Sequence, residues 1–284
     1  MAKAKATVHG AISLVNAIAT QKGATLGIEL KVDAIIETSS GRGISIQSEN
    51  KNLSSRLINK TIEKIISKKE LEENKIDVTL NSEIPTGYGL KSSSAISSAV
   101  ALACSKIFRP KLTDKQILLA GVEASIESKV SITGAYDDAC SCYYGGFNVT
   151  DNFKKNRIKS EKAPVNLIAV IFIPKNRKRG NLKNLKILSA VFENAWELAK
   201  KADYWNAMNI NGLATAATLN SDPKIIINLL EKGAYGASVS GNGPSIAAVT
   251  KKENESNIRK VFSTLEGNVI VSKINNKKAE VYEL

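Results

Sequence analysis

The stretch "PTGYGLKSSSA" at residues 85–95 constrains the fold of this chain more than any other. It lies between "KIDVTLNSEI", whose alternating pattern predicts a strand, and "SAISSAVALA", which predicts a helix beginning near Ser92 as its N-cap. Gly87 and Gly89 permit positive φ, so successive amide N–H groups can point inward. The N-terminus of the helix attracts anions, and Lys91 adds a cation. We therefore predict a cradle for phosphate at this loop.

Two well-known phosphate motifs do not fit the same stretch. The Walker pattern needs a glycine directly before the lysine, where this chain has Leu90. The dinucleotide fingerprint needs a third glycine where this chain has Ser92. An ordinary strand-to-helix turn would explain one glycine and one serine, but not the whole string.

The remaining pattern predicts a mixed α and β chain with two domains, which its 284 residues can fill. Strand-like segments in the first 50 residues are broken at glycines, which we interpret as turns at Gly23, Gly27, Gly41 and Gly43. The charged stretch "NFKKNRIKSEKAP" has the composition of a linker. We therefore place the domain boundary there, giving domains 1–160 and 161–284.

The composition of the chain indicates which kinds of binding partner to expect. The formal net charge of +13 favours anions, but the densest basic run, "PKNRKRG", carries no interleaved aromatic residues, so we expect no nucleic acid. Three cysteines and a single histidine, His9, predict neither a disulfide framework nor a zinc site. The apolar N-terminal segment is too short to span a membrane. We expect a cytoplasmic protein with no membrane partner.

Three motifs, taken in order along the chain, resemble those of the GHMP kinase superfamily. "PTGYGLKSSSA" is similar to its P-x-x-x-G-L-G-S-S-A signature, with Lys91 in place of the third glycine. "ITGAYDDAC" at 132–140 is similar to a turn whose aspartate faces the acceptor hydroxyl, and "VSGNGPS" at 239–245 is similar to a late glycine loop. The resemblance implies a two-domain α/β (α+β) kinase with a ribosomal S5 domain 2-like N-terminal domain and a ferredoxin-like C-terminal domain.

The resemblance also implies ATP and Mg²⁺ as cofactors. The ATP-binding residues would be those of the signature: Pro85, Thr86, Gly87, Tyr88, Gly89, Leu90, Lys91, Ser92, Ser93, Ser94 and Ala95. The metal ligands would be Ser93 and Glu127, with Glu123, one helical turn earlier, as the competing carboxylate.

Asp137 is the expected catalytic residue, which would orient or deprotonate the attacking hydroxyl. Repulsion from the adjacent Asp138 can raise its pKa toward that of a useful base. The alternative is that both carboxylates only stabilise a tight turn.

The segment "HGAISLVNAIATQKGATLGIEL" at 9–30 is similar to that of the archaeal-type shikimate kinases within this superfamily. The resemblance implies shikimate, a small molecule with one carboxylate and three hydroxyls, as the partner. The substrate-binding residues would be Asn16, Thr20, Lys22, Asp137, Gly241 and Gly243. Arg177 and Arg179 are alternative partners for the substrate carboxylate.

Several alternatives stay open at this point. Many members of the superfamily carry an N-terminal lysine near the catalytic aspartate, but this chain has Ala6-Thr7-Val8-His9, and Lys5, Lys22 or no residue supplies that charge. The acceptor could be homoserine or mevalonate. A basic nucleic-acid-binding protein and a non-catalytic ATP-binding regulator are rivals from other classes. We also allow for a homodimer.

Overall fold

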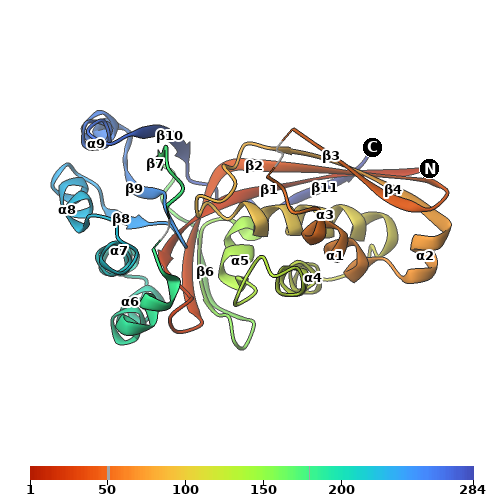
Figure 1. Cartoon of the computed structure of the whole chain (residues 1–284), viewed down its shortest axis with the longest axis horizontal. Helices are drawn as coiled ribbons and strands as arrows, with labels where there is room; N and C mark the ends of the chain where they lie inside the picture. Colours follow the sequence, from red (N-terminus) through yellow and green to blue (C-terminus); the bar gives the residue numbers. More distant parts are fainter. Residues whose placement is uncertain (50–51, 179) are drawn as a thin grey trace.

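The computed structural model describes residues 1–49, 52–178 and 180–284. Its larger sheet holds seven strands in the described part, in the order β11-β1-β2-β4-β3, with β5 pairing with β2 and β6 pairing with β5. The strands are β1 (Ala2–Val15), β2 (Lys22–Ser40), β3 (Gly43–Ser48), β4 (Asn74–Ser82), β5 (Phe147–Asp151), β6 (Asn156–Glu161) and β11 (Glu280–Glu283). Figure 1 shows this sheet with a row of helices along one side.

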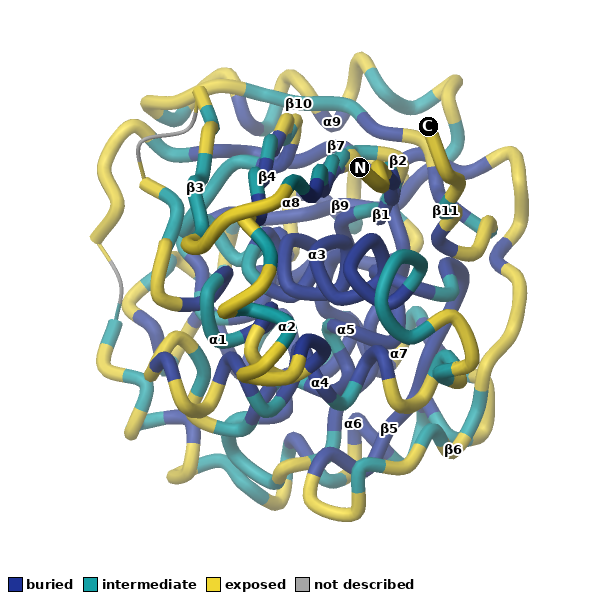
Figure 2. Tube along the Cα trace, turned by 90° about the vertical axis from the view of Figure 1, so that its right-hand side faces the viewer, coloured by how far each residue is buried: buried dark blue, intermediate teal, exposed yellow. Residues whose placement is uncertain are grey.

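Helix α3 lies at the centre of this half of the molecule. Figure 2 shows it as a buried tube among the other helices. It is built largely from alanine, serine and aliphatic residues, whose small members let neighbouring elements approach closely, and most of its side chains are buried. The helices of this half are α1 (Ser55–Ile65), α2 (Lys68–Glu73), α3 (Ser92–Phe108), α4 (Asp114–Glu127) and α5 (Tyr136–Tyr144).

The second sheet is antiparallel, in the order β10-β7-β9-β8. Its strands are β7 (Leu167–Pro174), β8 (Gly236–Val239), β9 (Ile246–Lys251) and β10 (Gly267–Lys273). Its helices are η1 (Leu182–Leu188), α6 (Ser189–Lys200), α7 (Tyr204–Thr218), α8 (Pro223–Glu231), η2 (Lys252–Asn254) and α9 (Glu255–Phe262). The chain order with helices between the first and second and the third and fourth strands is that of a ferredoxin-like unit.

Apolar packing is continuous between the two halves. Residues of β7, α6, α7 and β9 belong to the same buried cluster as the first sheet and its helices. The ring of Phe147 stacks on that of Tyr204 at 3.9 Å, and Trp196 Nε1 donates to the carbonyl oxygen of Thr150 at 3.0 Å. Strand β11 returns to pair with β1, so the two halves are also joined by the last strand.

The expected two-domain α/β fold is confirmed, but three local expectations are wrong. Gly23 and Gly27 lie inside β2 and not in turns. The predicted linker contains β6, whose polar side chains are exposed or half-buried because it is an edge strand paired only with β5. The stretch at 132–140, expected to be a turn, already contains the start of α5 at Tyr136. The boundary near residue 160 stays a prediction: β6 ends at Glu161, β7 begins at Leu167, and β11 lies in the first sheet.

Candidate active site

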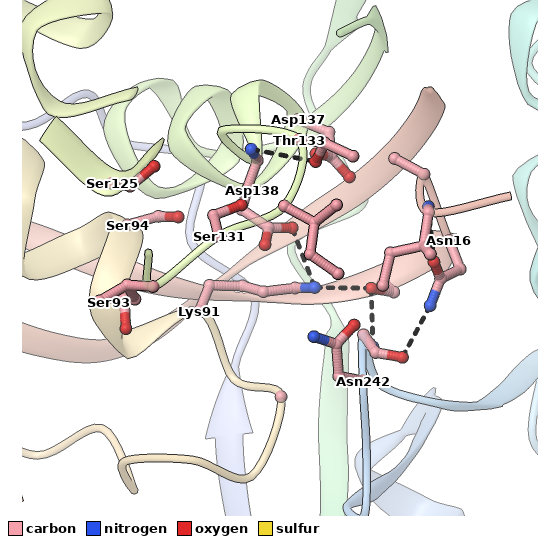
Figure 3. A pocket seen from close by; sticks show the side chains of 18 of the residues that line it. Asn16, Lys91, Ser93, Ser94, Ser125, Ser131, Thr133, Asp137, Asp138 and Asn242 are labelled. Atoms are coloured by element: carbon pink, nitrogen blue, oxygen red, sulfur yellow. Dashed lines mark hydrogen bonds and ion pairs between the residues drawn. The ribbon is translucent and has the colours of Figure 1, made fainter. Parts of the chain in front are cut away.

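A cavity of about 410 Å³ opens where four main segments of the chain meet, with Ser125 of α4 and Leu182 of η1 completing its wall (Figure 3). These segments are the end of β1, the first glycine loop (residues 85–91) with the start of α3, the 130–138 segment that leads into α5, and the late glycine loop (residues 239–245). The volume lies within the range of small-molecule sites. The lining residues are Ser13, Asn16, Ala17, Ile18, Thr86, Gly87, Gly89, Lys91, Ser92, Ser93, Ser94, Ser125, Val130, Ser131, Ile132, Thr133, Ala135, Asp137, Asp138, Leu182, Gly241 and Asn242.

The first glycine loop has the backbone conformation expected of a cradle. Gly87 and Gly89 both have φ of +84°, as the sequence predicts. The N-cap of α3, however, is Lys91 at φ +66°, and Ser92 is the first helical residue, so the expected serine cap is wrong. Among the described residues no side chain hydrogen-bonds to this end of the helix as a cap. Its N-terminal N–H groups and dipole therefore favour an anion in the pocket.

The late glycine loop packs directly against the first one. Ser240 Oγ donates to the carbonyl oxygen of Gly89 at 2.8 Å, and Ser245 Oγ donates to that of Tyr88 at 2.6 Å. A Cβ on Gly89 would lie 1.9 Å from the Ser240 carbonyl oxygen. The approach of the two loops therefore requires glycine at position 89, for space as well as for φ.

The side chain of Lys91 crosses the pocket instead of turning back to its own loop (Figure 3). Its Nζ lies 2.9 Å from Asp138 Oδ1 and donates to Ser13 Oγ at 2.7 Å. Its side chain is only 5% exposed. Lys91 is the one cationic side chain among the described lining residues, and Asp138 balances its charge. A triphosphate bound here would therefore need a further cation.

Asp137 lies in the first turn of α5, where it is 4% exposed. Asn152 holds it from both sides, because Asn152 Nδ2 donates to Asp137 Oδ1 at 2.6 Å and Asn152 Oδ1 accepts from Asp137 N at 3.0 Å. Thr25 Oγ1 donates to the Asp137 carbonyl oxygen at 2.8 Å. A Cβ on Gly23 would lie 2.4 Å from Asp137 Oδ2, so the glycine inside β2 makes room for this carboxylate.

The environment of Asp137 raises its pKa above the ordinary value of an aspartate. Burial, followed by the negative charge of Asp138, raises its pKa to about 7, against the smaller lowering effects of Lys91 and Asn152. A carboxylate with a pKa near neutrality can accept a proton from a hydroxyl in a transition state and release it afterwards. Asp137 therefore combines pocket access with the properties of a general base.

Asn16 uses its polar atoms to fix the wall of the pocket. Its N–H donates to Asn211 Oδ1 at 2.8 Å, its Nδ2 donates to the Gly241 carbonyl oxygen at 2.7 Å, and its Oδ1 accepts from Ile18 N at 2.9 Å. Asn16 and Gly241 both line the pocket, whereas Gly243 does not. Contact of these residues with a substrate stays a prediction.

Two predicted substrate residues lie outside the lining. Lys22 forms an ion pair with Glu193 of α6, and its Nζ lies 4.8 Å from the centre of the Trp196 ring. Thr20 Oγ1 accepts from the backbone N–H of Lys22 at 3.3 Å.

Part of the predicted ATP loop also lies outside the lining. Four of its residues do not line the pocket: Pro85, Tyr88, Leu90 and Ala95, of which the last two are core residues.

The predicted metal pair is not brought together. Glu127 pairs with Lys64 of α1 with its side chain 45% exposed, and Glu123 pairs with the same lysine at 3.7 Å. The residue of α4 that lines the pocket is Ser125, and Figure 3 shows it on the same side as Ser93 and Ser94.

The donor set of the pocket nevertheless suits Mg²⁺. The described chain has no group of three or more histidine, cysteine and acidic side chains that could hold a metal ion. Magnesium needs no such cage, because it keeps water and binds one or two carboxylates together with substrate phosphates. The lining offers several hydroxyls and the carboxylates of Asp137 and Asp138.

The other cations considered in the sequence lie elsewhere. Lys5 pairs with Asp33 at 2.9 Å on β1 and β2. Arg177 donates to the Thr86 carbonyl oxygen and stacks over Tyr88 at 5.0 Å, outside the pocket lining. Arg179 lies outside the described residues. His9 does not line the pocket either, and burial lowers its pKa.

Comparisons with known proteins agree with this geometry. A family model described as "GHMP kinases N terminal domain" matches residues 56–146, and one described as "GHMP kinases C terminal" matches residues 187–265. The chain is 37% identical to a shikimate kinase of Methanosarcina acetivorans, covering 96% of this chain and 95% of that protein. It is 36% identical to the shikimate kinase of Methanosarcina mazei over the same shares.

Among solved structures, a homoserine kinase from Cytophaga hutchinsonii superposes with a TM-score of 0.77 at 20% identity, covering 99% of this chain and 97% of that one. This likeness shows the fold alone. No helix in the described part of the chain is both long and apolar enough to cross a membrane.

Proposed function

This chain belongs to the GHMP kinases, and on that premise we propose that it transfers the γ-phosphoryl group of ATP to the 3-hydroxyl of shikimate. The observation that carries the proposal is the buried Asp137 at the start of α5, facing a pocket bounded by both glycine loops. The chain is thus an ATP-dependent small-molecule kinase. Two relatives at 36–37% identity that cover nearly the whole chain are named shikimate kinase, which supports this acceptor.

The transfer balances with the groups present. The acceptor oxygen forms a bond to the γ-phosphorus while the bond from that phosphorus to the β,γ-bridging oxygen breaks, and the electron pair of that bond leaves with ADP. The hydroxyl proton goes to the carboxylate of Asp137. Phosphoryl transfer needs positioning and charge neutralisation more than covalent chemistry. Asn152 and Gly23 fix Asp137 for that purpose.

The phosphates of ATP would lie at the N-terminus of α3, against the first glycine loop. Magnesium would be held there by Ser93, together with phosphate oxygens and water. Because Asp138 already balances the charge of Lys91, the metal ion would neutralise the charge of the phosphates. The carboxylate predicted at Glu127 has no part in this set, since it pairs with Lys64.

The pocket side of the late glycine loop and the 130–138 segment carries amides and hydroxyls, which suit an acceptor with several hydroxyl groups. These groups belong to Ser131, Thr133 and Asn242, and Asn16, just after β1, adds a further amide to the lining. We include a cytoplasmic location in the proposal, because the three cysteines are free and buried, as is usual in a reducing compartment.

The test is ADP release from Mg-ATP with shikimate, homoserine and mevalonate offered separately. We expect turnover with shikimate alone. Turnover with either of the other alcohols instead would keep the kinase and discard the acceptor. ATP binding without turnover on any alcohol would favour a non-catalytic regulator.

Asp137→Asn tests the role of the carboxylate. We expect turnover to fall by about 10²–10⁴-fold while ATP and shikimate still bind, since asparagine keeps the size and one acceptor. Asp33→Asn is the matched control, because Asp33 is ion-paired to Lys5 on the sheet, away from the pocket. Unchanged turnover in Asp137→Asn would remove this residue from the mechanism.

A further inference from the structure

We propose that the ammonium group of Lys91 contacts the transferring phosphoryl group as a catalytic residue, and that Asp138 and Ser13 are positioning residues that hold it there. The inference rests on the proposed phosphoryl transfer but not on the identity of the acceptor. It also assigns the active-site cation to the first glycine loop and not to the N-terminal strand.

The first argument is where the ammonium lies. Lys91 begins at the N-cap of α3, where the phosphates are expected, and its side chain ends beside Asp138, the neighbour of Asp137. The ammonium therefore lies between the place for the phosphates and the helix that carries the base. A cation in that position stabilises the charge on the equatorial oxygens of the phosphoryl group during transfer.

The second argument is that the described chain offers no substitute. Lys5 and Lys22 are ion-paired to Asp33 and Glu193 and do not line the pocket. Arg177 lies over Tyr88, outside the lining. Lys91 therefore supplies the positive charge that an N-terminal lysine provides near the catalytic aspartate in many members of the superfamily.

The third argument is that Lys91 is unfavourable as a structural residue. Its φ of +66° lies in the left-handed region, which glycine adopts readily and a residue with a Cβ does not. Its ammonium is also almost fully buried, and removing an ion from water costs free energy that one ion pair often fails to offset. Glycine at this position would avoid both the backbone strain and the burial of an ion. A role in binding or catalysis therefore best explains the lysine.

The fourth argument is the way in which the ammonium is held. Ser13 Oγ accepts from Lys91 Nζ at 2.7 Å and from the backbone N–H of Gly241 at 2.9 Å. Ser13 N in turn donates to Ser240 Oγ at 3.2 Å. The late glycine loop therefore fixes the serine that fixes Lys91, so the position of the cation depends on contact between the two halves of the molecule.

The decisive variants are Lys91→Gly and the double variant Lys91→Gly/Asp138→Asn. Glycine suits the backbone at this position, so both proteins should fold. If Lys91 only neutralised Asp138, removing both charges would restore activity. If Lys91 contacts the phosphoryl group, both variants should lose about 10²–10³-fold in kcat, the usual effect of removing one donor to a developing charge.

Binding gives a readout that does not depend on turnover. Aluminium fluoride with Mg-ADP mimics the phosphoryl group in flight, so its complex should bind both variants about 10²-fold more weakly than the unaltered chain. Mg-ADP alone should bind within about threefold of normal, which also shows that the site is folded. Ser13→Ala should lower kcat with little change in the KM for ATP, because it loosens Lys91 without touching nucleotide.

Lys5→Met is the control, since it removes an ion-paired lysine of β1 that does not line the pocket, and its kcat should stay normal. Recovery of kcat to within about fivefold in the double variant would overturn the inference. So would equal weakening of Mg-ADP and of its fluoride complex. Failure of the unaltered chain to use shikimate would sink the proposed acceptor alone, because the binding measurements need no acceptor.

Discussion

Two adjacent carboxylates of α5 have opposite surroundings. Asp137 is buried against Asn152 and Gly23, and its pKa is raised to about 7, whereas Asp138 faces the ammonium of Lys91 at 2.9 Å. Different environments give neighbouring acids different tasks. One can hold a transferred proton while the other holds a cation in place.

The pH dependence of turnover should report this division. Asp137 accepts a proton only when it is ionised, so kcat/KM should rise as the pH increases through about 7 and level off above it. Asp138→Asn removes a negative charge that raises the pKa of Asp137, so the rising limb should move to lower pH, even though the plateau also falls. A limb that stays in place or moves to higher pH would contradict this account.

Stability should depend on pH in the same window. Because the pKa of Asp137 rises on folding from its ordinary value of 3.8 to about 7, the folded state binds more protons between those values and loses stability as the pH increases. Asp137→Asn lacks this loss. The Tm of the variant minus the Tm of the parent should therefore be larger at pH 8 than at pH 4, by at least about 2–4 °C.

Asp33→Asn gives the opposite sign and serves as the control in these melts. Hydrogen bonds from Thr7 and Lys5 outweigh the effect of burial and lower the pKa of Asp33, so its carboxylate stabilises the fold at neutral pH and loses that contribution in acid. The variant should therefore melt below the parent at pH 8, with a smaller difference in acid. The same direction of change in both variants would refute the assignment.

The partners of these residues could not be predicted from the sequence. Asp137 follows from the motif "ITGAYDDAC", but Thr25 and Gly23 lie beside it on β2, more than a hundred residues earlier in the chain, and Asn152 lies in the turn after β5. Their only sequence signal is a glycine inside a long strand-like segment. Tertiary contacts of this kind leave no local pattern, and the same is true of Ser13 beside Lys91.

At the scale of elements, the contact between the two glycine loops decides the shape of the pocket. Gly89 and Gly43 have positive φ, but a Cβ on Gly89 would collide with the Ser240 carbonyl oxygen, whereas a Cβ on Gly43 would meet nothing within 4 Å. Alanine at either position should cost about 1 kcal/mol or more from backbone strain. Only Gly89→Ala should also separate the loops and lower kcat/KM, by about tenfold or more, as steady-state kinetics of both variants would show. Equal activities in the two variants would argue against loop contact as the cause.

Long periodic segments were predicted well, and short polar ones were not. The helix expected from about residue 92 is α3, and the strand expected just before the first glycine loop is β4. The strand β6 was missed because an edge strand with exposed side chains has the composition of a linker. The start of α5 was missed because its first turn carries two aspartates and is preceded by a glycine, which together indicate a turn.

At the scale of the whole molecule, one buried core crosses from the first sheet to the second. Both tryptophans of the chain, Trp196 and Trp205, lie at this joint, where Trp205 packs edge-on against Phe147 of β5. We expect a single cooperative unfolding transition, because a large apolar interface couples the halves. Tryptophan fluorescence and far-ultraviolet circular dichroism should therefore give the same midpoint in thermal melts. A fluorescence transition at clearly lower temperature would show that the joint opens first.

The pairing of β11 with β1 has a consequence for synthesis on the ribosome. Strand β1 pairs on one side with residues 280–283, so this edge stays open until those residues have been translated. Unpaired strand edges are the surfaces through which nascent chains associate wrongly. Lys3 and Lys5 lie on that strand and pair with Glu37 and Asp33 only once β2 has formed, so until then their like charges keep neighbouring nascent copies apart.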